Sequence, residues 1–260
     1  NSSDEAFNID LLLDSLKDLS GNSPSPNSIE NVLNIDTKRP VPITINPLNN
    51  PIYDGNTGAS LFEVEVIYSE PMDINQIPVL DVIHQVDLSS SISYNAFEGV
   101  WQNDTVFIAK FNVYDENIEV DSIDITINFA KDEAGNPQTL TTFENTLQLD
   151  TKNPQPIVFN ANTYSITNST NNYSVLIVFN EEMNQAVSPG IVFSNLMANN
   201  ALVFNPGLSQ WYNDITFEKV YDINNVDLSI QSISVVLNEG YDVAGNNVVL
   251  DTMESTTSIN

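Results

Sequence analysis

The feature that most constrains this chain is an internal repeat. The phrase KDEAGNP at 131–137 returns as YDVAGNN at 241–247, and DTKRPVPITI at 36–45 returns 114 residues later as DTKNPQPIVF at 150–159. Three further pairs keep the same order along the chain: VIYSEPMD and IVFNEEMN, WQNDTVF and WYNDITF, VYDENIEVDSIDI and VYDINNVDLSIQSI. Self-similarity at a fixed period of this length predicts tandem copies of one domain.

The first 35 residues keep the same register as the later repeats. Residues that recur 114 positions later are Lys17, Asp18, Gly21, Asn22 and Asp36, which return as Lys131, Asp132, Gly135, Asn136 and Asp150. We therefore expect residues 1–35 to be the closing part of an earlier repeat, followed by complete repeats at 36–149 and 150–260. The alternative for the leading segment is an amphipathic helix over DEAFNIDLLLDSLKDLSG with Asp4 as its N-cap, and the repeat register favours strands. A start in NSSDEAFNID without an initiator Met suggests a mature product or a fragment.

Each repeat reads as short strands between turn signals. The second repeat has five segments rich in Val, Ile, Phe and Tyr, at 174–179, 190–195, 201–205, 214–222 and 232–237. Clusters of Asn, Gly, Pro and Asp separate them, and we find no convincing helix between them. About seven strands in roughly 110 residues predict an all-β fold of tandem immunoglobulin-like β-sandwiches. Trp101 and Trp211 precede the fifth strand at equivalent places, so we expect both in the core.

Composition narrows the classes of partner. The chain has 35 acidic and 7 basic residues, for a net charge of −28, and it has no cysteine. Such a charge argues against nucleic acid and anionic membranes as partners and favours cations. Without cysteine, neither disulfides nor zinc-thiolate sites are available. No run of about 18 apolar residues occurs, so we expect no insertion into a membrane.

Catalytic signals are weak in this sequence. The only histidine is His84, which has no counterpart in the second repeat, and the chain has no cysteine nucleophile. No nucleophile and base can be paired on this basis. Paired carboxylates would suit a glycosidase, but no second chemical group accompanies them. We therefore expect a protein without enzymatic activity.

Acidic residues repeat at three loops that meet at one end of a seven-stranded sandwich. The loops are the chain's start in each repeat, the loop after its second strand and the loop holding the AGN phrase. The positions are Asp36, Glu70, Asp132 and Asn136 in the first repeat, and Asp150, Glu181, Asp242 and Asn246 in the second. Oxygen ligands of this kind suit Ca²⁺, with Asp115 or Glu116 as further candidates near the second set. The alternative is that the Asp in D-x-A-G-N only bonds the backbone of its own turn, and the sequence leaves both readings open.

The quoted phrases DTKNPQPIVF, VLIVFNEEMN, WYNDITF and YDVAGNN resemble the bacterial Ig-like repeats that form tandem arrays in large cell-surface proteins, including adhesins, gliding-type proteins and surface-layer components. The resemblance covers nearly the whole chain. It implies an extracellular, non-catalytic structural or spacer segment at the cell surface, in an adhesin stalk, a surface layer or a filament. Its partners would be neighbouring repeats and, through the N-terminal strands, other copies.

Two alternative functions remain open on the sequence. The first is a glycan- or protein-binding module, for which YDGN at 53–56 and NAFEGVW at 95–101 are the best candidates, because the first repeat is longer there. The second is a set of accessory domains in a secreted enzyme. Short, Pro-containing junctions between repeats favour a semi-rigid rod.

Overall fold

The computed structural model describes the chain except residues 1–4, 14–15, 24–26, 168 and 225–227. The fold is all-β, with 55% of these described residues in strands and 4% in helices. Two compact units can be separated, and each contains non-contiguous parts of the chain. The first unit comprises Asn1–Asn49, Gly58–Tyr114 and Ser122–Leu147, and the second comprises Asn50–Thr57, Asp115–Asp121 and Gln148–Asn260.

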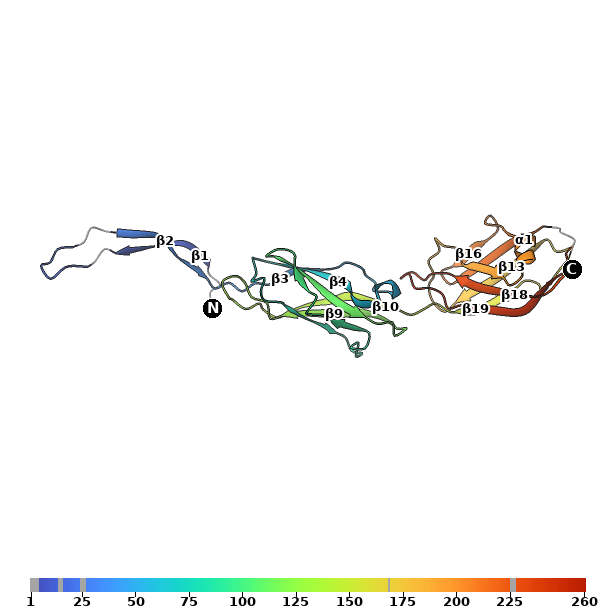
Figure 1. The fold of residues 1–260 in the computed structure, drawn as a ribbon, viewed down its shortest axis with the longest axis horizontal. Coiled ribbons are helices and arrows are strands. Elements are labelled where there is room, and N and C mark those ends of the chain that lie inside the picture. The colour runs from blue at the N-terminus through green and yellow to red at the C-terminus, as the bar shows by residue number, and fades with distance from the viewer. Residues whose placement is uncertain (1–4, 14–15, 24–26, 168, 225–227) are drawn as a thin grey trace. The chain divides into compact units, whose positions relative to one another are not determined.

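Besides the leading two-stranded sheet described below, the first unit contains two antiparallel sheets (Figure 1). The larger sheet has the order β3-β4-β8-β6, with β7 also paired to β8. Its strands are β3 (Pro42–Pro47), β4 (Gly58–Tyr68), β6 (Ile92–Tyr94), β7 (Val100–Trp101) and β8 (Val106–Val113). The smaller sheet has the order β10-β9-β5. Its strands are β5 (Val79–Ile83), β9 (Glu119–Asn128) and β10 (Thr141–Asp150).

Alternation of apolar residues explains how each sheet presents one face to the core. In β4, Phe62, Val64 and Val66 are fully buried, and the residues between them are partly exposed. In β9, Ile123 and Ile125 are fully buried in the same alternating way. Successive side chains of a strand point to opposite faces, so this period of two is the pattern of a sandwich with one buried and one solvated face per sheet.

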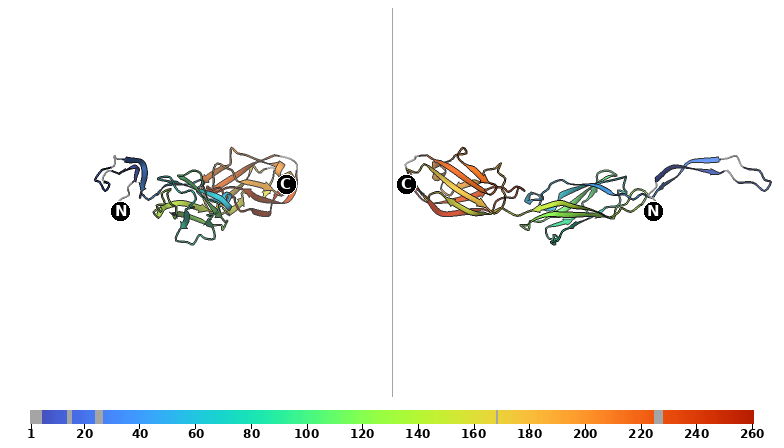
Figure 2. Two further views of the ribbon diagram at one scale, coloured as in Figure 1. Left: turned by 60° about the vertical axis from the view of Figure 1, so that its left-hand side comes forward. Right: turned by 180° about the vertical axis from the view of Figure 1, so that it is seen from behind.

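The second unit also contains two sheets, which Figure 2 shows from two further directions. One has the order β11-β13-β17-β15, with β16 also paired to β17. Its strands are β11 (Pro156–Ala161), β13 (Asn172–Phe179), β15 (Leu202–Phe204), β16 (Gln210–Asn213) and β17 (Thr216–Ile223). The other has the order β12-β19-β18-β14. Its strands are β12 (Ser165–Ile166), β14 (Gly190–Phe193), β18 (Ile230–Glu239) and β19 (Asp251–Ile259). The five segments expected from the sequence are thus present as β13, β14, β15, β17 and β18.

Both tryptophans pack against aromatic residues at the margin of a core, and neither is fully buried. The Trp101 ring lies 5.1 Å from that of Phe107, centroid to centroid, and the Trp211 ring lies 4.9 Å from that of Phe217. Trp101 donates its indole N–H to the carbonyl of Gln76 at 3.1 Å. Packing at equivalent places agrees with the expected core role, although both indoles keep part of their surface in solvent.

The expectation that no helix interrupts the strands is wrong at one place in the second unit. A six-residue helix, α1 (Leu196–Ala201), lies between β14 and β15. Asn195 caps it by accepting the N–H of Met197 at 2.8 Å, and Ala198 and Ala201 are buried. The two buried alanines, three residues apart, place one face of this single turn in the core. A second short element, the 3₁₀ turn η1 (Asp54–Asn56), belongs to the second unit.

The leading segment forms a two-stranded hairpin, as the repeat register predicted, and not a helix. Strand β1 (Glu5–Leu13) pairs antiparallel with β2 (Asn27–Asp36), from Glu5 opposite Asp36 to Leu13 opposite Asn27. Two register shifts interrupt the pairing, between Ala6 and Ile9 and between Ile9 and Leu11. Asp4, the N-cap of the alternative helix, lies outside the described residues.

Candidate functional site

The repeated phrase, DEAGN at 132–136, DVAGN at 242–246 and DLSGN at 18–22, forms the same turn in all three places. Asp132 Oδ1 accepts the N–H of Asn136 at 2.7 Å, and Asp242 Oδ1 accepts the N–H groups of Gly245 and Asn246 at 2.6 and 2.9 Å. In the leading hairpin, Asp18 Oδ1 accepts the N–H of Asn22 at 2.8 Å. The intervening glycines have positive φ, as this turn requires. The phrase therefore recurs because its Asp closes a local turn.

The Asn of the phrase ties this turn to the start of its own repeat. Asn136 donates Nδ2–H to the Asp36 carbonyl at 3.2 Å, and Asn246 donates to the Asp150 carbonyl at 2.8 Å. Asn246 is fully buried, and its Oδ1 accepts the N–H of Asp54 at 2.8 Å. The amide oxygen that we expected to face a metal is thus already bonded to a backbone N–H.

Three of the predicted carboxylates meet in the second unit. Asp150 ends β10, Glu181 follows β13, and Asp242 lies between β18 and β19; each offers an oxygen, and these oxygens lie within 4.8 Å of one another. In the first unit the corresponding group is Glu5, Asp36 and Glu70. Glu5 was not among the residues expected here, and Asp132 instead holds its own turn.

Each group also contains a lysine that the sequence analysis did not single out. Lys152 Nζ lies 3.1 Å from Glu119 and 3.6 Å from Glu181. Lys38 Nζ lies 3.7 Å from both Glu5 and Glu70. Glu5 and Lys38 recur 114 residues later as Glu119 and Lys152. The repeat therefore already contained this pattern. Both DTK phrases carry the Lys, and the Glu is the first residue of β1 and of β9.

Burial and mutual repulsion set the electrostatics of these groups. Burial raises the pKa of Asp150 to about 6, and the charges of Asp242 and Glu119 push it the same way. Burial also raises the pKa of Glu181, although the charge of Lys152 opposes this. The pKa of Glu70 is raised by burial as well, against the charge of Lys38. The single lysine ammonium in each group therefore offsets only part of the group's negative charge.

Asp54 is a further carboxylate of the second unit that interacts with this group through the charge of Asp242. It lies in η1, where Asn153 donates Nδ2–H to Asp54 Oδ2 at 2.8 Å, while Asp54 Oδ1 is buried without a hydrogen-bond partner. Glu181 Oε1 is likewise buried without a hydrogen bond, its contact being the ion pair with Lys152. Burial raises the pKa of Asp54, and the charges of Asp115 and Asp242 add to the effect. Asp54 has no acidic equivalent 114 residues later, where the sequence has Asn168, so the repeat could not reveal it.

The donor set is suited to a hard cation. Carboxylate oxygens are the ligands that Ca²⁺ takes. Glu181 Oε1, in the group with Asp150 and Asp242, is buried without a hydrogen bond, and so is Asp54 Oδ1, on a carboxylate that interacts electrostatically with Asp242. Asp115 Oδ1 accepts the N–H of Asn117 at 2.9 Å, so part of its capacity is used locally. Lys152 supplies a competing positive charge from the protein itself. The residues therefore fit either bound calcium or a lysine-bridged carboxylate cluster.

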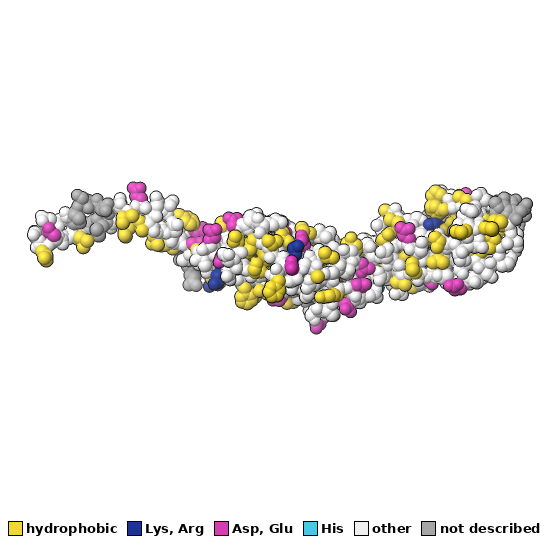
Figure 3. All heavy atoms as spheres, viewed as in Figure 1, with side chains coloured by type: hydrophobic (Ala, Val, Ile, Leu, Met, Phe, Trp, Pro, Cys, Tyr) yellow, Lys and Arg dark blue, Asp and Glu magenta, His cyan; other side chains and the backbone are white. Residues whose placement is uncertain are grey.

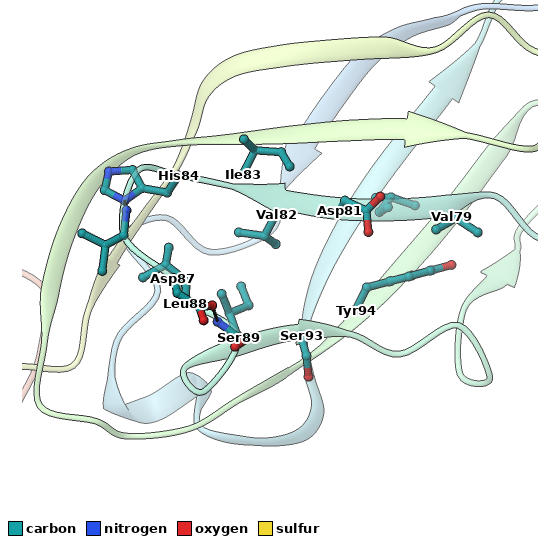
Figure 4. A pocket seen from close by; sticks show the side chains of 13 residues that line it. Val79, Asp81, Val82, Ile83, His84, Asp87, Leu88, Ser89, Ser93 and Tyr94 are labelled. Atoms are coloured by element: carbon teal, nitrogen blue, oxygen red, sulfur yellow. Dashed lines mark hydrogen bonds between the residues drawn. The ribbon is translucent and has the colours of Figure 1, made fainter.

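One surface cavity of the first unit has no convergent chemistry. It has a volume of about 400 Å³ and lies between β5 and β6. His84 lies at one end of it and Tyr94 at the other (Figure 4). His84 Nδ1 accepts the N–H of Val86 at 3.1 Å, and the Tyr94 hydroxyl donates to the Pro78 carbonyl at 2.7 Å. These two hydrogen bonds join His84 and Tyr94 to backbone groups and do not join the two side chains to each other.

The two segments suggested for a binding module differ in exposure. Tyr53 of YDGN packs beside Gly245, where an added Cβ would lie 3.2 Å from the tyrosine ring. In NAFEGVW, Phe97 is 99% exposed and Val100 is 51% exposed. A single exposed aromatic ring beside one valine is a small apolar surface of a kind common on globular proteins.

No protein-family model matches this sequence, and no curated protein matches it. Among the described residues, the helices are too short and too polar to cross a membrane.

Proposed function

We propose that this chain is a non-catalytic structural segment of an extracellular surface protein, built from tandem immunoglobulin-like domains. The strand order supports the fold part of the proposal. Immunoglobulin constant-type domains place strands A, B, E and D in one sheet and C, F and G in the other. The orders β3-β4-β8-β6 and β10-β9-β5 follow that scheme, as do β11-β13-β17-β15 and β19-β18-β14.

The single observation that supports the structural role is the kind of residue that the repeat preserves. The repeated positions hold residues that pack the core or form turns, and they do not supply a nucleophile with a base. The turn formed by Asp132 and Asn136 is repeated by Asp242 and Asn246 down to the bond that reaches the start of each repeat. A protein selected for catalysis needs a nucleophile or an acid and base placed around a substrate. A protein selected for extension needs many copies of a stable domain.

Labelling of intact cells tests the proposed location. Antibodies raised against residues 150–260 should bind unpermeabilised cells that make the protein, and brief protease treatment of those cells should remove the signal. An antibody to a cytoplasmic protein is the control for cell integrity. Labelling that requires permeabilisation would contradict the extracellular role.

We further propose that the second unit binds Ca²⁺ through Asp54, Asp150, Glu181 and Asp242, and that Glu5, Asp36 and Glu70 form a lesser site in the first unit. A cation that binds only the folded state stabilises it by RT ln(1 + [L]/Kd), or about 2.7 kcal/mol at a hundredfold excess over Kd. The supporting observation is the pair of buried carboxylate oxygens without hydrogen bonds, on Asp54 and Glu181.

Thermal unfolding with calcium and with chelator tests this site. We expect the unfolding midpoint of the second unit to rise in calcium, and the rise to be lost in Glu181→Gln, which keeps the shape of the side chain. Glu182→Gln is the matched control, because Glu182 is the exposed neighbour of Glu181. A midpoint that ignores calcium in the unmodified chain would leave the lysine-bridged cluster as the correct description.

A further inference from the structure

The leading hairpin carries apolar side chains that nothing in its own two strands can cover. Leu11 is 59% exposed, Leu33 is 53% exposed and Ile35 is 41% exposed. Hydrophobic side chains are visible along the hairpin in Figure 3. Within the described residues, β1 and β2 form a sheet of two strands, so the outer edge of β1 is unpaired. A two-stranded hairpin of this kind is at best marginally stable alone.

The hairpin repeats the backbone of two strand pairs that are covered. Asn8 and Asn31 have positive φ values of 58° and 56°. Their equivalents are Ser122 and Asn145 in β9 and β10, at 59° and 51°, and Ser232 and Ser255 in β18 and β19, at 59° and 48°. Residues other than glycine seldom adopt this conformation, so three matching pairs are specific.

The side-chain bond that accompanies this irregularity is also repeated. Asn31 donates its N–H to Asp10 Oδ1 at 2.9 Å, and Asn145 donates to Asp124 Oδ1 at 2.7 Å. Asp10 and Asp124 are 114 positions apart, as are Asn31 and Asn145. The hairpin therefore has the local geometry of β9 and β10 without their surroundings.

Those surroundings show what covers such a strand pair. Leu11 and Leu33 correspond to Ile125 and Leu147, both of which are 0% exposed. Strand β5 pairs along the edge of β9 from Asp124 to Asn128. In the second unit, the equivalent of Ile125 is Val235, which shares one core with residues of β13 and β17, and the equivalent of Leu147 is Thr257, which is 1% exposed. An edge strand and an opposing sheet thus complete the pair in both units.

We propose that the hairpin is a docking surface for the body of a further repeat of this type, attached on its amino-terminal side. The body would place a strand like β5 on the free edge of β1 and a sheet like β4 and β8 over Leu11, Leu33 and Ile35. Burying these leucine side chains removes apolar surface from water, which stabilises a hairpin that is marginal alone. This inference rests on the repeat register and not on the proposed extracellular role, so failure of the cell-labelling test would leave it standing.

Hydrogen exchange on a hybrid chain tests the proposal. Residues 37–118, the body of the first repeat, are placed directly before Glu5 of the otherwise unchanged chain, so that Glu5 follows as Glu119 does. We expect the amides of β1 and β2 to exchange about 100-fold more slowly in the hybrid than in the chain itself. Unchanged exchange of β1 and β2 would overturn the proposal.

A matched pair of substitutions in the hybrid separates specific docking from general collapse. Leu11→Asp, on the face equivalent to the buried Ile125, should abolish the protection. Leu12→Asp, on the opposite face, where the equivalent residue is the partly exposed Thr126, should leave it in place. Equal effects of the two substitutions would contradict the docking geometry. Protection that arises in the unmodified chain only as its concentration rises would identify a second copy as the partner and would also overturn the proposal.

Discussion

At the scale of single residues, Asn246 makes the most consequential contacts in the candidate site. Its Nδ2 donates to the Asp150 carbonyl and to Asp242 Oδ2 at 2.8 and 2.9 Å, and its Oδ1 accepts from Asp54. One buried amide thus connects the turn, the start of the repeat and η1. A buried donor or acceptor left without a partner costs about 1–3 kcal/mol.

We predict that Asn246→Ala lowers the free energy of unfolding of the second unit by about 3 kcal/mol, because it orphans the Asp54 N–H and the Asp150 carbonyl. Asn22→Ala is the matched control: Asn22 occupies the same place in the leading hairpin, is exposed, and should have no measurable effect. Urea denaturation followed by Trp211 fluorescence, in a Trp101→Phe background, measures the change. Similar stability of the two variants would show that Asn246 has no special role.

Asp150 gives a prediction about pH. Its pKa is raised by burial to about 6, with Asp242 and Glu119 adding to the shift and Lys152 opposing it. A carboxylate whose pKa is raised on folding favours the folded state at low pH, and this contribution is lost as the pH rises through about 6. Without calcium, the second unit should therefore be more stable at pH 5 than at pH 7.

The measurement is the urea midpoint at pH 5, 6 and 7, again with Trp211 as the only tryptophan. Asp150→Asn cannot ionise and should reduce this difference. A profile that is as steep in Asp150→Asn as in the unmodified chain would assign the pH dependence to other groups, Glu181 first among them.

At the scale of elements, irregularities at equivalent places interrupt the pairing of β1 with β2 and of β18 with β19. In β10, Asn145 has a φ of 51° and donates its N–H to Asp124 Oδ1 across the pair. Irregularities of this kind bend a strand and fix its register against its neighbour. The same positions in β2 and β19 carry Asn31 and Ser255, so the irregularity belongs to the repeat.

We predict that Asn145→Val destabilises the first unit by about 2 kcal/mol, because a β-branched residue is strained at positive φ. Asn145→Gly should change the stability by less than about 0.5 kcal/mol, since glycine adopts this conformation freely. Denaturation followed by Trp101, with Trp211→Phe, distinguishes the two. Equal stabilities would mean that the strand shifts register to avoid the strain.

At the scale of the whole molecule, the fold must tolerate a large excess of negative charge. The chain carries 35 acidic residues and 7 basic ones. The ion pairs of Lys38 and Lys152 neutralise only a few of the acids. Repulsion among the remaining carboxylates opposes the compact state.

We predict that added NaCl raises the thermal unfolding midpoint in the absence of divalent cations. Raising the ionic strength from about 0.01 M to 0.1 M shortens the screening length from about 30 Å to about 10 Å, which weakens repulsion between distant carboxylates. The gain should level off near this range, unlike the continuing rise expected for a salting-out effect. A midpoint that falls with NaCl would show that the few ion pairs outweigh the repulsion.

Much of the local structure followed from the sequence alone. Repeated phrases identified equivalent residues and predicted the leading hairpin in place of a helix, and runs rich in Val, Ile, Phe and Tyr between turn residues predicted the strands. The convergence of Asp150, Glu181 and Asp242 was also predictable, because the loops at one end of a sandwich lie close together. These features depend on periodicity and on turn chemistry, both of which are properties of neighbouring residues.

Other features were decided only by the tertiary structure. Asp54 joins the candidate site because η1 belongs to the second unit, although it lies almost a hundred residues before Asp150 in the sequence. The side-chain oxygen of Asn246 was expected to face a metal, and in the fold it accepts the N–H of Asp54 instead. The helix α1 forms where the core can bury Ala198 and Ala201. Each outcome depends on contacts between distant segments, and their free energies are set by burial that no local pattern encodes.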